Sequence, residues 1–212
     1  MNKIFDLALE AIHCNKCFGH GDLVRAGIGM PQPPWIGSDY FKQRTRILLI
    51  ALNPGSKSSG DYKLERKRLL QKFKGGDSQA LRDYFSSPGT IGNAKLLAML
   101  SSTGLSLSNI AVANVALCAT ESNKYPRHFL KTCFSVHTSR WLKELKPTGV
   151  ISMGNEAHRF KEQIDTALLP VRVSQYPALH FSSRFSNPRK QEDYRAIRNW
   201  LKELSDTAPT TS

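Results

Sequence analysis

The chain has 212 residues, of which 40% are hydrophobic, so it is long and apolar enough to bury a core. It contains no run of about 18 or more apolar residues, which argues against a membrane-spanning helix. Thirty Lys and Arg against seventeen Asp and Glu give a formal charge of +13. That excess predicts a polyanionic partner, most naturally nucleic acid, with an ordinary basic protein as the alternative.

The N-terminal residues include Asp6 and Glu10 and no small-residue cleavage site, so we expect no secretory signal. We therefore place the chain in the cytoplasm, where thiols stay reduced and structural disulfides are rare. Because no repeat or low-complexity linker interrupts the sequence, we expect one domain over residues 1–204 and a disordered polar tail over residues 205–212. We expect a monomer that does not bind membranes.

The first half of the chain predicts one strand and three helices. Residues 44–55 form a short apolar run closed by Asn-Pro-Gly, a pattern typical of a buried strand and a tight turn. Residues 61–73 have apolar side chains at helical spacing and a basic outer face. We interpret that face as solvated, with DNA contact as the alternative. A short helix is predicted over residues 78–85, and a buried helix over residues 91–105.

The second half alternates strands with helices. Strands are predicted over residues 109–118, 148–154 and 171–181, and helices over residues 126–146, 155–165 and 187–204. This order predicts an α/β fold of three layers, with a central four-stranded parallel sheet flanked by helices. Ligands of such folds bind beyond the carboxyl ends of the strands. The rule selects the loops at Asn53, after Asn114 and after His180.

Four cysteines are the most specific chemical feature. Cys14 and Cys17 form a Cys-x-x-Cys pair, whereas Cys118 ends a predicted strand and Cys133 lies in the next helix. Four thiolates can bind zinc or an iron–sulfur cluster. Zinc ribbons usually use two Cys-x-x-Cys pairs, and a bulky cluster tolerates widely separated ligands better than one ion does. The alternative is four unrelated buried thiols.

Taken together, the motifs resemble the uracil-DNA glycosylase superfamily, especially its iron–sulfur-containing family 4 branch. That family has an N-terminal Cys-x-x-Cys, a strand ending in Asn-x-x-x-Cys and a further cysteine in the next helix, which Asn114 and the four cysteines match. The resemblance runs from about residue 5 to residue 204. It implies a uracil-DNA glycosylase-like fold and a 4Fe–4S cluster held by Cys14, Cys17, Cys118 and Cys133, with zinc as the alternative.

The first catalytic motif of the family is a Gly-x-x-Pro-Gly turn, which corresponds here to the turn from Ala51 to Gly55. Leu52 stands where family 4 enzymes usually have a glutamate. Asn53 is similar to the residue that positions the attacking water in the mismatch-specific and single-strand-selective branches. The resemblance therefore implies that Asn53 is catalytic and that Leu52 lies at the substrate.

The second motif of the family is His-Pro-Ser after the fourth strand. Here His180 is followed by Phe181 and Ser182, so the proline is replaced. A rival alignment places Tyr176 at the start of the motif and leaves no histidine at the catalytic position. We expect His180 to donate a hydrogen bond to uracil O2, where negative charge develops as the base leaves.

Asn114 and several aromatic residues are the candidates for binding the base. The Asn114 carboxamide offers an acceptor and a donor that match uracil N3–H and O4, whereas cytosine presents the reverse pattern. The family's Gly-x-Pro-Phe segment, whose ring stacks on the base, has no equivalent here. Tyr84 or Phe85 could take its place, because residues 56–88 look like an insertion that replaces that segment.

The loop after His180 contains Ser182, Arg184 and Phe185, which could supply phosphate contacts and a wedge. The leading hypothesis is a monofunctional glycosylase of base-excision repair. It would remove uracil, or a related deaminated base, flipped out of DNA and leave an abasic site. The alternatives are a catalytically silent iron–sulfur nucleic-acid-binding protein of the same fold and a zinc protein of that fold.

Overall fold

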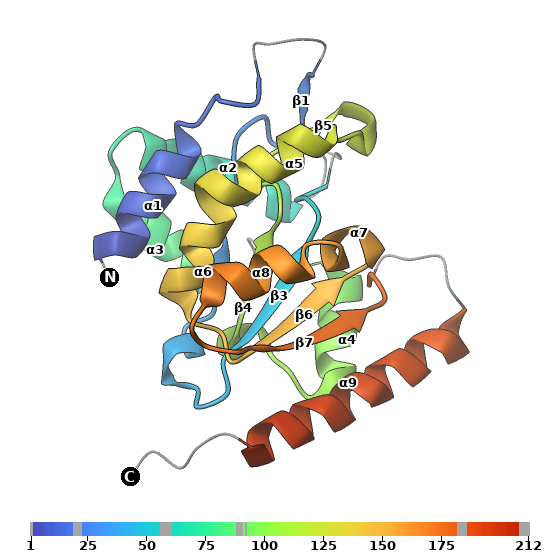
Figure 1. Ribbon diagram of the computed structural model, residues 1–212. Coiled ribbons are helices and arrows are strands. Elements are labelled where there is room, and N and C mark those ends of the chain that lie inside the picture. Colours follow the sequence, from blue (N-terminus) through green and yellow to red (C-terminus); the bar gives the residue numbers. More distant parts are fainter. Residues whose placement is uncertain are drawn as a thin grey trace.

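The computed structural model describes residues 2–18, 23–55, 61–87, 91, 93–181 and 186–207. A five-stranded sheet in the order β2-β4-β3-β6-β7 runs through its centre (Figure 1). The strands are β2 (Trp35–Ile36), β3 (Ile47–Ala51), β4 (Ile110–Asn114), β6 (Gly149–Met153) and β7 (Ser174–Ala178). The α/β class is confirmed, and the four predicted strands form a parallel group, β4-β3-β6-β7. The predicted total of four strands is wrong, because the two-residue strand β2 pairs antiparallel with β4 as a fifth strand.

Burial explains the strand pattern. Every residue of β3 and β6, the two inner strands that lie side by side, is buried, as expected for strands covered on both faces. Strand β7 forms an edge and is half exposed. It contains Pro177, which an edge strand tolerates because one side of its backbone has no partner strand.

Helices cover both faces of the sheet (Figure 1). Helices α4 (Ala94–Thr103) and α9 (Asn187–Thr207) pack together on one face. Helices α6 (Ser139–Leu145) and α8 (Lys161–Leu168) pack together on the other. The remaining α-helices are α1 (Asn2–Ile12), α2 (Asp61–Lys74), α3 (Ser78–Ser86), α5 (Arg127–Cys133) and α7 (Asn155–His158). The three-layer architecture predicted from the sequence is therefore present.

Three predicted helices differ in detail. Residues 126–146 form α5 and α6, joined by a π-helical segment, Phe134–Thr138. Residues 155–165 divide into α7 and α8. Helix α9 continues to Thr207, three residues into the predicted tail, and residues 208–212 lie outside the described ranges.

The basic helix α2 is less solvated than predicted. Lys63 and Arg66 are buried, and the Arg66 guanidinium donates a hydrogen bond to Gln32 Oε1. Two cations of this helix therefore face the protein interior and do not belong to a solvated basic surface.

A small antiparallel sheet pairs β1 (Arg25–Ala26) with β5 (Ala119–Thr120), and so connects the N-terminal segment to the chain that follows β4. Within the part of the chain that is described, no helix is both long enough and apolar enough to cross a membrane.

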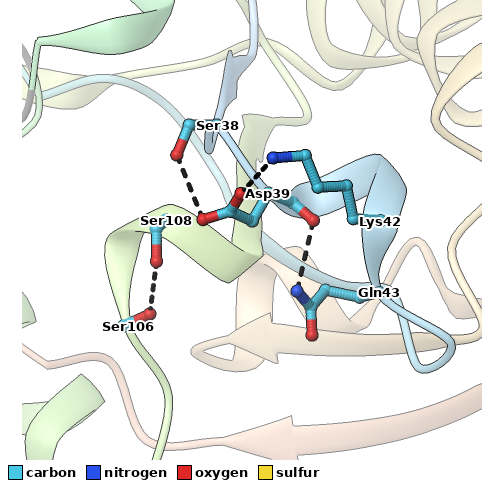
Figure 2. Close-up of polar contacts among 6 residues, drawn as sticks. All are labelled: Ser38, Asp39, Lys42, Gln43, Ser106 and Ser108. Carbon is cyan, nitrogen blue, oxygen red and sulfur yellow. Dashed lines mark hydrogen bonds and ion pairs between the residues drawn. The ribbon is translucent and has the colours of Figure 1, made fainter.

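A polar cluster lies at the amino end of β4, the end opposite to the predicted site (Figure 2). The Asp39 carboxylate accepts hydrogen bonds from Ser38 Oγ at 3.3 Å and from Lys42 Nζ at 2.8 Å. The Asp39 N–H donates to Ser108 O at 2.8 Å, and the hydroxyls of Ser106 and Ser108 lie 2.9 Å apart. These contacts anchor the turn after β2 and are remote in the topology from the carboxyl ends of the strands.

Candidate functional site

The ends of β3 and β4 are joined beyond the regular sheet. Ala51 lies opposite Asn114 in the parallel register. The pairing continues, because Val115 N–H donates to Ala51 O at 2.8 Å and Ala116 N–H donates to Leu52 O at 2.9 Å. The first predicted motif and the asparagine predicted to recognise the base therefore lie side by side at the carboxyl end of the sheet.

Asn53 shapes the turn after β3. Its Oδ1 accepts a hydrogen bond from Gly55 N–H at 2.7 Å, and Gly55 has a positive φ of 79° that favours glycine. One lone pair of the oxygen that we expect to hold a water is thus already used. The second lone pair and the amide NH₂ group can still bind a water molecule. Leu52 is half-buried and packs against the core.

Asn114 is fixed through its backbone. Thr138, at the end of the π-helical segment, donates its hydroxyl to Asn114 O at 2.9 Å and to Val115 O at 3.1 Å. The half-buried Asn114 carboxamide has no hydrogen-bond partner among the described residues. An amide held in this way, at the carboxyl end of an inner strand, can offer its donor and acceptor to a ligand.

His180 lies two residues beyond the end of β7. Gly154, which follows β6, donates its N–H to Ala178 O at 2.8 Å. Gly154 has a positive φ of 88°, which favours glycine, and a Cβ added there would lie in ordinary contact with the Cβ of His180, at 3.4 Å. The His180 ring stacks on Phe181 with 4.4 Å between centroids, and burial lowers the pKa of His180 below its ordinary value.

Asp193 of α9 positions the chain just before His180, and the sequence analysis missed it. Its carboxylate accepts hydrogen bonds from Leu179 N–H at 2.9 Å and from the Tyr176 hydroxyl at 3.3 Å. Tyr176 also packs its ring against Trp200 of α9. This geometry favours the alignment that uses His180, because Tyr176 lies within β7 and is bonded to α9. No sequence signal distinguishes Asp193, because α9 contains four acidic and five basic residues.

Lys63 is a second residue missed from the sequence. It is 5% exposed, and its Nζ would lie 3.8 Å from a Cβ added at Gly55. A buried cation therefore lies beside the turn that contains Asn53. The sequence shows that Lys63 belongs to a basic helix, but it does not show that the side chain points towards the protein interior.

The two aromatic candidates differ in exposure. Tyr84 is 1% exposed and donates its hydroxyl to Pro33 O at 2.8 Å, so its ring belongs to the core. Phe85 is half-buried at the core margin, which makes it the better candidate for stacking on a base. The three predicted DNA-contacting residues, Ser182, Arg184 and Phe185, lie outside the described residues.

All four cysteines line one small cavity. Cys14 and Cys17 follow α1, Cys118 follows β4, and Cys133 is the last residue of α5. The other residues that line the cavity are Phe18, Pro31, Leu117, Phe129 and His137. The Nε2 atom of His137 is buried and has no hydrogen-bond partner in the described part of the chain. The fold thus brings together cysteines that are up to 119 positions apart in the sequence.

Burial keeps the two inner thiols protonated at neutral pH. It raises the pKa of Cys118 far above the ordinary range and raises that of Cys133 to about 12. The hydrogen bond from Leu117 N–H to Cys133 Sγ, at 3.2 Å, opposes this rise only in part. A metal bound here would therefore have to displace protons from the thiols.

The four thiols are the donor type of two metal groups. Zinc and 4Fe–4S clusters are both held by cysteine thiolates, so the donor set is compatible with either. Among the described residues, no three His, Cys, Asp or Glu side chains lie close enough together to hold a single metal ion.

A larger cavity, of about 470 Å³, lies between α5 and the α7–α8 segment. None of the residues predicted to be catalytic or to bind the base lines it. We call the site formed by Asn53, Asn114 and His180 the strand-end site. The strand-end site and this cavity are therefore separate features of the surface.

No known protein-family model matches the chain, and a search of curated proteins finds no match.

The lowered pKa of His180 predicts a titration midpoint below 6.5, the ordinary value for histidine, because burial disfavours the charged imidazolium. The imidazole should then be neutral at pH 7. NMR titration of the imidazole resonances measures the midpoint, and the spectrum of His180→Gln assigns the signal. A midpoint at or above 6.5 would contradict the buried environment described here.

Proposed function

We propose that the protein is a DNA glycosylase that hydrolyses the N-glycosidic bond of uracil, or of a related deaminated base, flipped out of DNA. The observation that carries this proposal is the Asn114 carboxamide, which has no hydrogen-bond partner among the described residues and ends an inner strand next to the Asn53 turn. His180 follows β7, whose carboxyl end lies at the same end of the sheet because β7 is parallel to its neighbour β6. The formal charge of +13 suits a nucleic-acid substrate.

The chemistry assigns a separate task to each residue. Cleavage leaves negative charge on the base and a cationic, oxocarbenium-like sugar. Neutral His180 donates an N–H to uracil O2, and Asn114 pairs with N3–H and O4. Asn53 holds the attacking water but cannot act as a strong base. Since Leu52 supplies no carboxylate, we expect slower turnover than in enzymes that have an acid at this position.

Buried positive charge supports the same reaction. Lys63 lies beside the Asn53–Gly55 turn in a site of low exposure, where an ammonium group interacts with an anion more strongly than it does in water. An anionic leaving base is stabilised by such a charge. Lys63 thus adds an electrostatic contribution that the Asn53 carboxamide cannot provide.

We assign the four cysteines to a 4Fe–4S cluster with a structural role. Bound there, the cluster would cross-link the end of α1, the loop after β4 and the end of α5. Cys118 follows Asn114 by only four residues, so the cross-link would restrain the loop that carries the base-recognising amide. The cysteines take no part in bond cleavage in this proposal.

A second candidate function is a catalytically silent nucleic-acid-binding protein of the same fold. The hydrogen bond from Gly55 N–H to Asn53 Oδ1 favours it, because this bond gives Asn53 a structural role in the turn. The leucine at position 52 favours it as well.

An oligonucleotide assay tests the leading proposal. Purified protein is incubated with single- and double-stranded DNA that contains one uracil, and abasic sites are then cleaved with alkali. We expect strand scission, and we expect His180→Ala to reduce its rate by about 10²-fold or more, as removal of a donor to a developing anion does. His13→Ala is the matched control, because His13 is exposed and bonds only to Leu9 of its own helix segment.

Two results would count against this proposal. Binding of both DNAs without scission would favour the silent protein. Scission that His180→Ala leaves unchanged would remove His180 from the mechanism.

Anaerobic purification tests the cluster. We expect brown protein that absorbs near ~400 nm and contains about four iron and four sulfide ions per chain, the composition of this cluster type. Cys118→Ser should lose the colour and lower the free energy of unfolding, because the loop after β4 loses its cross-link. Colourless protein loaded with zinc would contradict the cluster. A stable, coloured Cys118→Ser protein would contradict the structural role of Cys118.

A further inference from the structure

The cavity between α5 and the α7–α8 segment has the size of a ligand site. Its volume of about 470 Å³ falls within the roughly 300–1,000 Å³ typical of small-molecule pockets. Its lining includes Tyr125, Arg127, Lys131, Glu156, Arg159 and Phe160. Neither the strand-end site nor the cysteine cavity uses any of these side chains.

Two aromatic side chains give the cavity an apolar wall that is held in place. The Tyr125 hydroxyl accepts a hydrogen bond from Thr120 N–H at 3.2 Å and donates one to Cys118 O at 3.3 Å. Phe160 is buried and packs against Phe134 with 5.3 Å between ring centroids. Aromatic faces fixed in this way can stack on a planar base at little cost in side-chain entropy.

The positive charges at the cavity are only partly neutralised. Arg127 and Lys131 are four residues apart on α5, so both lie on one face of that helix. Both are exposed, and neither forms a hydrogen bond or an ion pair with any described residue. Arg159, in contrast, pairs with Glu156 at 2.8 Å. Two uncompensated cations therefore remain beside the aromatic wall.

The cavity lies at the same end of the sheet as the candidate site. Helix α7, which supplies Glu156, begins directly after Gly154, the residue that His180 approaches. Figure 1 shows α7 at the carboxyl end of β6, and both α7 and α5 contribute residues to the cavity. A nucleic-acid strand that presents a base to the strand-end site can therefore pass over this cavity.

We propose that this cavity binds one nucleotide of a nucleic-acid strand. Arg127 and Lys131 contact the phosphate, and the base stacks against Tyr125 and Phe160. Guanidinium and ammonium groups form charge-assisted hydrogen bonds with phosphate, and aromatic rings stack on every base without regard to sequence. That the strand is the one carrying the damaged base rests on the proposed function; binding of a nucleotide does not.

Fluorescence anisotropy with a labelled single-stranded oligothymidylate that contains no uracil tests the proposal without any need for catalysis. We expect Arg127→Gln/Lys131→Gln to weaken binding about five-fold at 0.1 M salt, because the one phosphate that the two side chains contact contributes about 0.7 to the slope of log affinity against log salt. The slope itself should fall by about 0.7. The control is Arg198→Gln/Lys202→Gln, which removes the same charge at the same spacing from exposed positions of α9, on the other face of the sheet.

Competition experiments distinguish a nucleotide within a strand from a free mononucleotide and from phosphate alone. Unlabelled thymidine trinucleotide should compete with the labelled strand, and inorganic phosphate at the same concentration should not. Stronger competition by thymidine monophosphate than by the trinucleotide would contradict a strand-binding role and indicate a free mononucleotide. An oligomer with abasic sugars should bind the wild-type protein less tightly than oligothymidylate, because it cannot stack.

Three outcomes would overturn the proposal: no binding by the wild-type protein, equal losses in the two double variants, or equal affinity for the abasic oligomer. Circular dichroism of each variant shows whether the fold is intact, and the exposure of all four substituted residues favours that result. If uracil DNA is not cleaved but the double variant at α5 still loses affinity selectively, the proposed glycosylase fails and the nucleotide site stands.

Discussion

The parallel pairing of β3 with β4 is the constraint on which the rest of the candidate site depends. Two backbone hydrogen bonds carry this pairing beyond the strands, from Val115 to Ala51 and from Ala116 to Leu52. They keep the Asn53 turn beside the start of the loop that leads to Cys118. Without them, the Asn53 and Asn114 amides would belong to independent loops.

The same loop links the candidate site to the cysteine cavity. Thr138 binds the carbonyl groups of Asn114 and Val115 from the π-helical segment, and Cys133 lies just before that segment. Leu117 N–H reaches Cys133 Sγ a few residues later. One short stretch of α5 and its π turn therefore supports both the amide and the thiols, and π turns are frequent at functional sites. The position of Asn114 is thus coupled to the packing of Cys133.

Local pattern predicted the inner strands and most helices, whereas features set by distant contacts escaped it. The apolar run of β3 and the glycine that ends α4 were readable, because burial on both faces and a left-handed helix end each leave a sequence signal. Strand β2 has only two residues, and its pairing with Val112 defines it. The inward direction of Lys63 and the contact of Asp193 with β7 depend on how helices dock, which periodicity does not encode.

The central claim is that the Asn114 amide, held at the paired carboxyl ends of β3 and β4, recognises the base. The most direct measurement is the rate of uracil release from single-stranded DNA by Asn114→Ala, alongside its free energy of unfolding. The account predicts a rate at least ~10²-fold lower, since buried recognition groups then lack their partner, with stability close to that of the wild type. An unchanged rate in a stably folded variant would contradict the account.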